Sequence, residues 1–113
     1  MNIIAITQKG AGKTENEDRI VAGKNIIADG FFRTQDFCGA VAVADGVGGN
    51  NAGAMASHFV AGCLAALENV CVEAFSAINE DLLALSASSP SMIRWRQRFR
   101  VLHYREKRLA FSA

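Results

Sequence analysis

Two acidic positions in the sequence are candidates for binding a divalent cation. Glu17 and Asp18 belong to the stretch GAGKTENEDR (residues 10–19), and Asp45 follows the apolar stretch VAVA and precedes Gly46. Hard cations such as Mg²⁺ and Mn²⁺ prefer carboxylate, carbonyl and water oxygens. A lone Asp-Gly pair after a strand is usually only a turn. Here an apolar strand delivers Asp45 to a glycine-rich loop whose backbone can approach a ligand closely, and a second acidic cluster stands elsewhere, so the combination favours a metal site.

The main alternative for residues 10–19 is a nucleotide-binding P-loop, because Gly12, Lys13 and Thr14 match the end of that motif. A P-loop requires a glycine five positions before Gly12, where Thr7 stands, and it opens a helix. The acidic stretch ENEDR follows instead of an apolar helix. These acids would repel a nucleotide phosphate, so the sequence argues against nucleotide binding here.

The residues around these acids are typical of β-strands. Residues 3–7 (IIAIT) are β-branched and bounded by a turn signal, residues 19–23 (RIVAG) predict a second strand, and KNIIADG continues into a hairpin-like excursion. Residues 37–45 (FCGAVAVAD) form a continuous apolar run. Such a run is typical of a strand that is buried on both faces.

Two helices are predicted after these strands. The first covers residues 52–67, where apolar residues recur at three- and four-residue spacings, and its expected N-cap is Asn50 or Asn51. The second covers residues 70–85 and is ended by SASSP. Three strands followed by two helices predict an α+β fold rather than alternating βαβ units. The expected buried residues are Met55, Phe59, Val60, Cys63, Leu64 and Leu67, then Val72, Phe75, Ile78, Leu82 and Leu85. Small residues expected to pack closely on a sheet are Ala52, Gly53, Ala54, Ala56 and Ser57.

Composition changes abruptly near Met92. Residues 1–92 hold five Lys/Arg and ten Asp/Glu, whereas residues 93–113 hold seven Lys/Arg and one Glu, and all ten glycines lie at or before Gly62. The basic tail alternates cationic and other residues over positions 94–100, which fits an amphipathic strand or a nucleic-acid-binding arm. No membrane span or signal peptide is visible, and the three cysteines form no CxxC pair. We therefore expect a cytoplasmic protein with reduced thiols and no membrane partner.

The motifs NEDR (residues 16–19) and VAVADGVGGNNAG (residues 41–53), followed by a helix of small residues, resemble the metal-dependent type 2C (PPM-type) protein phosphatases in their bacterial form. The resemblance covers residues 1–92. It implies an α-β-β-α sandwich, in which two antiparallel sheets are flanked by helices and the metal site lies at one end. It also implies that phosphoserine or phosphothreonine proteins are hydrolysed by a water shared between two divalent cations, Mn²⁺ or Mg²⁺.

The resemblance also implies a role for each matching residue. Asp18 binds a metal directly or through a water, Asp45 bridges the two metals, and Gly46 offers its backbone carbonyl. Glu17 matches an acidic position beside the first ligand, with a less certain role. Lys13 stands where the family usually has the arginine that holds the substrate phosphate. Because lysine cannot make the bidentate contact of arginine, this departure weakens the expected phosphate affinity.

The later acidic motifs of the family are missing. After Asp45 the only aspartate is Asp81, inside a predicted helix. If the codon of Arg94 ends in A, the codons from that base to Arg100 can encode Met-Ala-Thr-Thr-Val-Ser, close to the strand that the family has there. We therefore predict that residues 1–92 are the N-terminal, incomplete part of a phosphatase domain. The tail, residues 93–113, is predicted to be out of frame and not native to the fold, and the truncated chain to be inactive alone.

Two other functions fit parts of the sequence. The chain could be a non-catalytic fragment that binds phosphopeptide, or one that binds nucleic acid through its basic tail, although the acidic body argues against nucleic acid as a dedicated partner. Glu15 and Asn16 are expected to be solvated loop residues, Met55 and Phe59 core residues, and His58 a packed or surface residue. Half a sandwich exposes a sheet edge and apolar surface, so we expect poor solubility or a molten state.

Overall fold

The computed structural model describes residues 1–47, 52–88, 96–105 and 108–112, which fold into two antiparallel sheets and two helices. The helices are α1 (Ala52–Ala66) and α2 (Val72–Ala87). The strands are β1 (Ile3–Thr7), β2 (Asp18–Ala22), β3 (Asn25–Ile27), β4 (Gly30–Thr34), β5 (Gly39–Val47), β6 (Arg96–Arg105) and β7 (Arg108–Ser112). The strands and helices expected from the sequence over residues 3–7, 19–23, 37–45, 52–67 and 70–85 are confirmed, with shifted ends.

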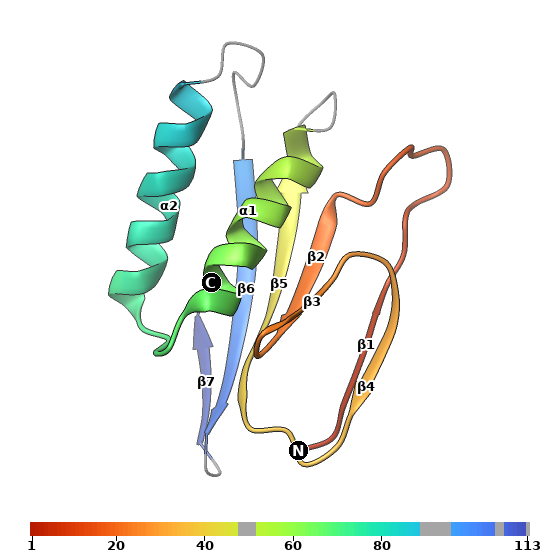
Figure 1. Ribbon diagram of the computed structural model, residues 1–113, viewed down its shortest axis with the longest axis vertical. Helices are drawn as coiled ribbons and strands as arrows, with labels where there is room; N and C mark the ends of the chain where they lie inside the picture. Colours follow the sequence, from red (N-terminus) through yellow and green to blue (C-terminus); the bar gives the residue numbers. More distant parts are fainter. Residues whose placement is uncertain (48–51, 89–95, 106–107, 113) are drawn as a thin grey trace.

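The larger sheet has the strand order β3-β2-β5-β6-β7, and β1 pairs only with β4 in a two-stranded sheet that we call the β1–β4 ribbon. Figure 1 shows α1 and α2 lying across one face of the larger sheet. The ribbon lies beside β2 and β3, which it contacts. The structure therefore confirms an α+β fold built from antiparallel sheets.

Glycines in the left-handed region shape the connections around β2 and β4. Gly23 (φ +61°) makes the turn between β2 and β3, and Gly30 (φ +93°) begins β4. A side chain would be strained in either conformation. The hairpin expected from KNIIADG is confirmed by the pairing of β2 with β3. β4 is a strand that the sequence pattern did not predict, and it is held by a distant partner, with Ile3 opposite Thr34.

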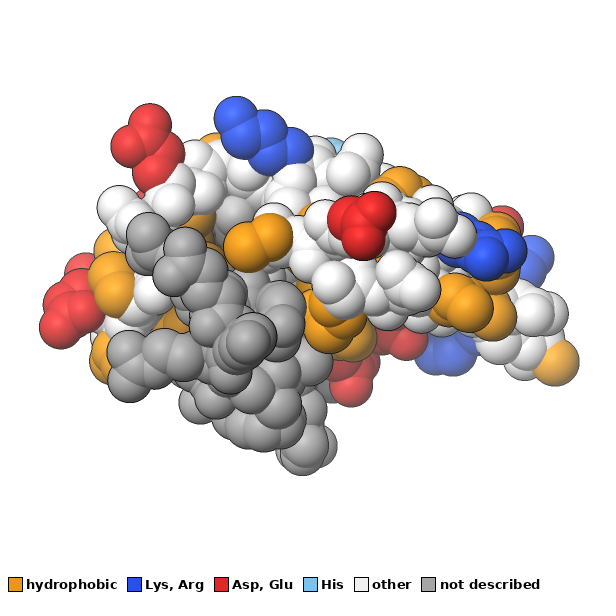
Figure 2. All heavy atoms as spheres, turned by 90° about the horizontal axis from the view of Figure 1, so that it is seen from below, with side chains coloured by type: hydrophobic (Ala, Val, Ile, Leu, Met, Phe, Trp, Pro, Cys, Tyr) orange, Lys and Arg blue, Asp and Glu red, His pale blue; other side chains and the backbone are white. Residues whose placement is uncertain are grey.

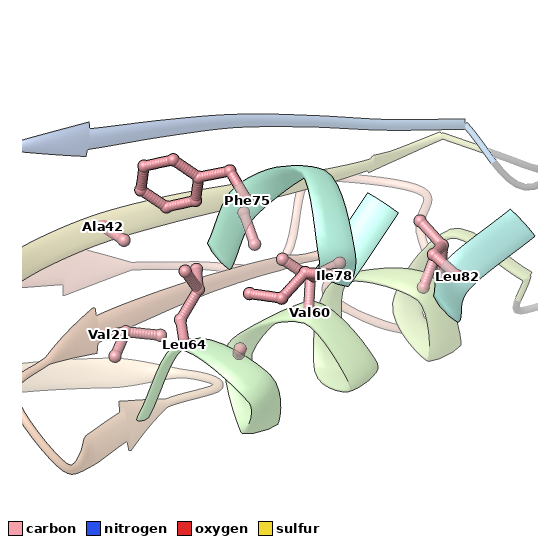
Figure 3. Packing of buried hydrophobic residues seen from close by; sticks show 10 residues of the cluster. Val21, Ala42, Val60, Leu64, Phe75, Ile78 and Leu82 are labelled. Carbon is pink, nitrogen blue, oxygen red and sulfur yellow. The ribbon is translucent and has the colours of Figure 1, made fainter. Parts of the chain in front are cut away.

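The main core lies between the larger sheet and the two helices. Val60 and Leu64 of α1 point into the space between Ala42 of the sheet and Phe75 of α2 (Figure 3). Because the sheet is covered by helices on this face alone, the side chains buried here alternate along β2 and β5. The buried members of this core are Val21, Ala42, Ala44, Ala56, Val60, Ala61, Leu64, Phe75, Ile78 and Leu82.

The prediction that β5 is buried on both faces is wrong. Ala42 and Ala44 are buried against the helices, but Val43 between them is 44% exposed. An antiparallel sheet can leave one face open, and the apolar run of β5 did not reveal which face its neighbours would cover.

The buried face of α1 differs from the expected stripe. Met55 is 46% exposed and is not a core residue, which corrects that prediction, whereas Phe59 packs against the core at partial burial. The small residues Gly53, Ala54, Ala56 and Ser57 face inward instead, as expected for a helix that approaches a sheet closely. In α2, Val72 and Leu85 are exposed, contrary to expectation. In the described part of the chain, no helix is long and apolar enough to cross a membrane.

The basic tail supplies two strands of the larger sheet. β6 pairs with β5 from Gly39 to Val47, with Asp45 opposite Arg98, and β7 pairs with β6. The interpretation of this tail as a strand is therefore confirmed, and its origin in another reading frame stays a prediction. The expected N-cap, Asn50 or Asn51, lies outside the described residues.

A contact between two glycines joins the start of α1 to the end of β5. A Cβ atom placed on Gly46 would lie 1.9 Å from the carbonyl oxygen of Gly53 and 2.7 Å from that of Glu17. The backbone N–H of Gly46 donates a hydrogen bond to the same Glu17 carbonyl (3.1 Å). Only glycine fits at position 46, because any side chain would force the helix or β2 away from β5.

We predict that Gly46→Ala lowers the free energy of unfolding by about 3 kcal/mol or more, the upper end of overpacking costs, because two backbone elements must separate. Gly62→Ala is the matched control. Gly62 lies in exposed α1 backbone with no atom within 4 Å of its Cβ position, so this change should raise stability by about 0.5–1 kcal/mol. Urea unfolding followed by circular dichroism measures both. Equal effects of the two substitutions would contradict the close contact.

The β1–β4 ribbon buries one face and exposes the other. Ile3 and Ala5 are buried, whereas Ile4, Ile6 and Phe31 are 64–65% exposed. The register places Ile6 directly opposite Phe31, so they share the exposed face. Figure 2 shows apolar side chains at the surface of the ribbon end of the molecule. This exposed apolar face is consistent with the expectation of poor solubility.

We predict that Ile6→Thr increases the soluble concentration of the chain and reduces binding of the dye ANS, with little change in stability, because Ile6 is 65% exposed. Ile3→Thr, in the same strand but 8% exposed, should instead destabilise the fold by about 1–3 kcal/mol. Light scattering, ANS fluorescence and thermal unfolding of both variants measure this. A sharp cooperative melt of a fully soluble wild-type monomer would rule out the aggregation-prone surface.

Candidate metal centre

β2 and β5 place the two predicted metal ligands directly opposite each other. In their antiparallel register, Asp18 is the partner of Asp45, and the next pair on the same face of the sheet is Ile20 with Val43. Directly opposite residues point to the same face, with Cβ atoms about 4.5–5.5 Å apart. The two carboxyl groups therefore lie together on the face of the sheet opposite to the helices. The expected proximity of Asp18 and Asp45 is confirmed, and their role as metal ligands stays a prediction.

The environment of this acid pair raises the pKa of the Asp18 carboxyl above its ordinary value. The largest cause is partial burial, followed by the negative charge of Asp45, a side-chain hydrogen bond with Asp45, and the charge of Glu17. Arg19 opposes these effects. Burial and a neighbouring like charge both disfavour the charged form of a carboxyl group. A bound cation would offset the repulsion between the two carboxylates.

The acid pair fits part of a metal site. Two carboxylates that share a face are suitable ligands for Mn²⁺ or Mg²⁺. Among the described residues, however, no group of three or more His, Cys, Asp or Glu side chains could hold a metal ion. The carbonyl oxygen of Gly46, the third expected ligand, lies against the first turn of α1, 3.0 Å from the Cβ position of Gly53. The described part of the chain thus supplies two acidic ligands and not the full set for two cations.

Glu17 contacts the start of α1 as well as Lys13. Its Oε2 atom lies 3.1 Å from the Cβ position of Gly53, in the first turn of the helix, where the helix dipole favours a negative charge. Its Oε1 atom lies 3.8 Å from Nζ of Lys13. Because the Lys13 side chain is 59% exposed, this ion pair contributes little stability. The carboxylate of Glu17 therefore lies between Lys13 and the start of α1, beside the acid pair.

Lys13 reaches the same pocket as the acid pair. The loop from β1 to β2 turns at residues 10–13, where the N–H of Lys13 donates to the carbonyl of Gly10 (3.1 Å) and Gly12 has φ +79°. The pocket has a volume of about 310 Å³. Lys13 therefore shares one pocket with four acids, which are Glu15, Glu17, Asp18 and Asp45. Its lining residues are Gln8, Gly10, Lys13, Glu15, Asn16, Glu17, Asp18, Asp45 and Gly46.

Asn16 is not the solvated loop residue that we expected. Its Nδ2 atom donates hydrogen bonds to Oγ1 of Thr7 (2.9 Å) and to the carbonyl of Ala28 (2.9 Å). Its Oδ1 atom accepts from the backbone N–H of Asp18 (3.0 Å). The available signal was an asparagine two residues before the first residue of a strand, a spacing that suits a local side-chain turn. Its distant partners could not be read from the sequence.

Glu15 is exposed, as expected, and it lines this pocket. His58 on α1 is also exposed and takes no part in the pocket. A pocket of about 380 Å³ lies at the opposite ends of β2 and β5, beside the end of α1. Its lining is mainly apolar residues and glycine, with one acid, Glu68, so it lacks the paired acids of the candidate metal centre. No family model, curated protein or solved structure matches the chain.

We predict that Asp45→Asn raises the free energy of unfolding of the metal-free chain at pH 7 by up to about 1 kcal/mol, because it removes a like-charge pair. The pKa of Asp18 is higher in the folded chain than in the unfolded chain. The stability that protonation of Asp18 contributes is therefore fully present below its pKa in the unfolded chain, and it is lost as pH rises through its pKa in the folded chain. The advantage of the variant should therefore shrink as pH falls through the raised pKa of Asp18.

Urea unfolding between pH 3.5 and pH 8 measures this dependence, over a range that brackets ordinary carboxyl pKa values. Asp29→Asn is the matched control, since it makes the same change at an exposed residue before β4. Identical pH profiles for the Asp45 and Asp29 variants would show that Asp18 and Asp45 do not interact.

Proposed function

We propose that residues 1–92 are the N-terminal part of a metal-dependent type 2C protein serine/threonine phosphatase domain. The observation that supports this most is the placement of Asp18 opposite Asp45 in the register of β2 and β5, in one pocket with Lys13. The NEDR and VAVADG motifs match Asp18 and Asp45 to metal ligands of the family, and Lys13 stands five residues before Asp18, where the family has a basic phosphate-binding residue. Like charges directly opposite each other destabilise a sheet, so stability alone gives no reason for this pairing. A cation-binding role would give one.

The positions of these groups suit the proposed reaction. Asp18 and Asp45 would hold Mn²⁺ or Mg²⁺, with the Gly46 carbonyl as a neighbouring oxygen. When bound, the cations lower the pKa of a shared water and screen the charge of the phosphate oxygens. Lys13 would orient the phosphate of a phosphoserine or phosphothreonine side chain. With only two acidic ligands in the described residues, this chain should bind the metal weakly and turn over little or no substrate.

The arrangement of the two sheets supports the sandwich that the resemblance implies. The helices cover the face of the larger sheet that carries Val21 and Ala42. On the other face, Ala22 and Ile27 are also buried, and the β1–β4 ribbon is the neighbouring element that contacts β2 and β3. In the proposed sandwich, the ribbon begins the second sheet. Val43, which is 44% exposed, marks the part of this face that the second sheet would cover. The acid pair lies at one end of that face.

We predict that the full chain binds Mn²⁺ and that Asp45→Asn weakens this binding about tenfold or more, because one of two acidic ligands is lost. Asp29→Asn should bind Mn²⁺ as the wild type does. Isothermal titration calorimetry, or electron paramagnetic resonance of free Mn²⁺, measures the affinity. A phosphoserine peptide assayed with Mn²⁺ should show turnover at or below detection. Equal Mn²⁺ affinity in Asp45→Asn and the wild type would remove the basis of the proposed function.

The reading-frame proposal has its own test in the gene. A gene with one base inserted ahead of the last base of codon 94 would read Met-Ala-Thr-Thr-Val-Ser next, and its product should show Mn²⁺-dependent hydrolysis that Asp45→Asn abolishes. If no frame of the downstream DNA encodes the Thr-Thr strand and later aspartate motifs, the proposal of a frameshifted phosphatase is discarded.

A further inference from the structure

The loop that carries Lys13 is closed at its base by a side-chain hydrogen bond. Residues 8–15 leave β1 after Thr7 and return towards β2 at Asn16. Nδ2 of Asn16 donates to Oγ1 of Thr7 (2.9 Å), and Thr7 is 8% exposed. The bond therefore joins the two ends of the loop at a partly buried point, where breaking it would leave polar atoms with poor access to water.

The orientation of the Asn16 amide is fixed by its partners. The carbonyl of Ala28 can only accept a hydrogen bond, so the NH₂ group must face it (2.9 Å). The N–H of Asp18 can only donate, so the amide oxygen must face that group (3.0 Å). One side chain thus connects β1, the turn before β4, and the first residue of β2, which is one half of the acid pair.

Arg19 holds the same segment through its backbone. Its Nη1 atom donates to the carbonyls of Asn16 (2.6 Å) and Asp18 (2.8 Å). Arg19 is 8% exposed, and its Nε atom has no hydrogen-bond partner in the described structure. Asp18 is therefore fixed by Asn16 through its N–H group and by Arg19 through its carbonyl group, and it cannot move independently of the loop base.

We propose that Asn16 is a positioning residue of the candidate metal centre. Its amide oxygen fixes Asp18 relative to Asp45, and its amide nitrogen, through Thr7, fixes the loop that brings Lys13 to the same pocket. The inference rests on the proposed function and deepens it, because it assigns the alignment of the metal-binding and phosphate-binding halves of the site to one side chain. Asn16 lines the pocket, but in this role it acts through Asp18 and Lys13.

The two halves of the Asn16 amide can be tested separately. Thr7→Val removes the hydroxyl and keeps the shape, so it releases the loop while the bond to Asp18 remains. We expect Mn²⁺ affinity within about twofold of the wild type, and affinity for inorganic phosphate at saturating Mn²⁺ about fivefold weaker, the effect of one neutral hydrogen bond. Thr7→Ser should restore it. Asn16→Ala should weaken Mn²⁺ binding about tenfold as well, as loss of an outer ligand contact does.

The matched control is Thr34→Val at the other end of the ribbon, whose hydroxyl donates a long hydrogen bond to the carbonyl of the neighbouring Gln35 (3.5 Å). It should leave both affinities unchanged. A second measurement needs no metal: hydrogen exchange of the amides of residues 10–15 should accelerate in Thr7→Val and not in Thr34→Val. The role of Asn16 would be overturned if Thr7→Val changed neither the phosphate affinity nor the hydrogen exchange of the loop. It would also be overturned if Thr34→Val changed both as much as Thr7→Val does.

The outcomes also separate this inference from the proposed function. If the wild-type chain binds no Mn²⁺, the proposed function fails, and the hydrogen-exchange measurement alone decides whether Asn16 clamps the loop. If the wild type binds Mn²⁺ and phosphate but Thr7→Val binds both equally well, the metal centre stands and the positioning role of Asn16 is wrong.

Discussion

The close approach of Gly46 and Gly53 is the constraint on which the rest of the structure depends. Because neither residue carries a side chain, the first turn of α1 lies directly on the end of β5, and the carbonyl of Glu17, the residue before β2, meets the same point. Three elements that are distant in the sequence therefore meet within van der Waals contact. The small inward face of α1 extends this contact along the helix. The candidate metal centre lies at this junction, so its geometry is set by backbone contacts rather than by flexible side chains.

The acid pair is unfavourable for the stability of the sheet. A sequence selected only for a stable sheet would place opposite charges, or apolar side chains, at a directly opposed pair. Here Asp18 and Asp45 are opposed, and the pKa of Asp18 is raised by partial burial and by its acidic neighbours. The surrounding structure holds Asp18 in place through hydrogen bonds with Asn16 and Arg19. The proposed binding of a cation would account for this otherwise unfavourable pairing.

Much of the fold could be predicted from the sequence, because apolar periodicity reports directly on secondary structure. The strands β1, β2 and β5 and both helices were found in this way. β4 was missed because Phe31 and Phe32 do not alternate with polar residues and because its partner β1 is more than twenty residues away. α1 is apolar on most of its surface, so its pattern could not identify the buried face, and Met55 was wrongly placed in the core. The proximity of Asp18 and Asp45 was expected from the resemblance of their motifs to one phosphatase family, because no pattern in the sequence showed that β2 and β5 would pair. The role of Asn16 could not be predicted, because Thr7 and Ala28 come from other elements.

The pairing of β5 with β6 has a consequence for how such a fold evolves. A strand edge recognises its neighbour through main-chain N–H and C=O groups, which every residue other than proline presents alike. β5 is paired along its full length by a basic segment whose composition differs from the rest of the chain. Coding changes that rewrite such a segment can therefore leave the hydrogen-bonding pattern of the sheet intact while erasing the side chains that a catalytic site needs. An exposed edge is capped in the process, which lowers the risk of strand-mediated aggregation.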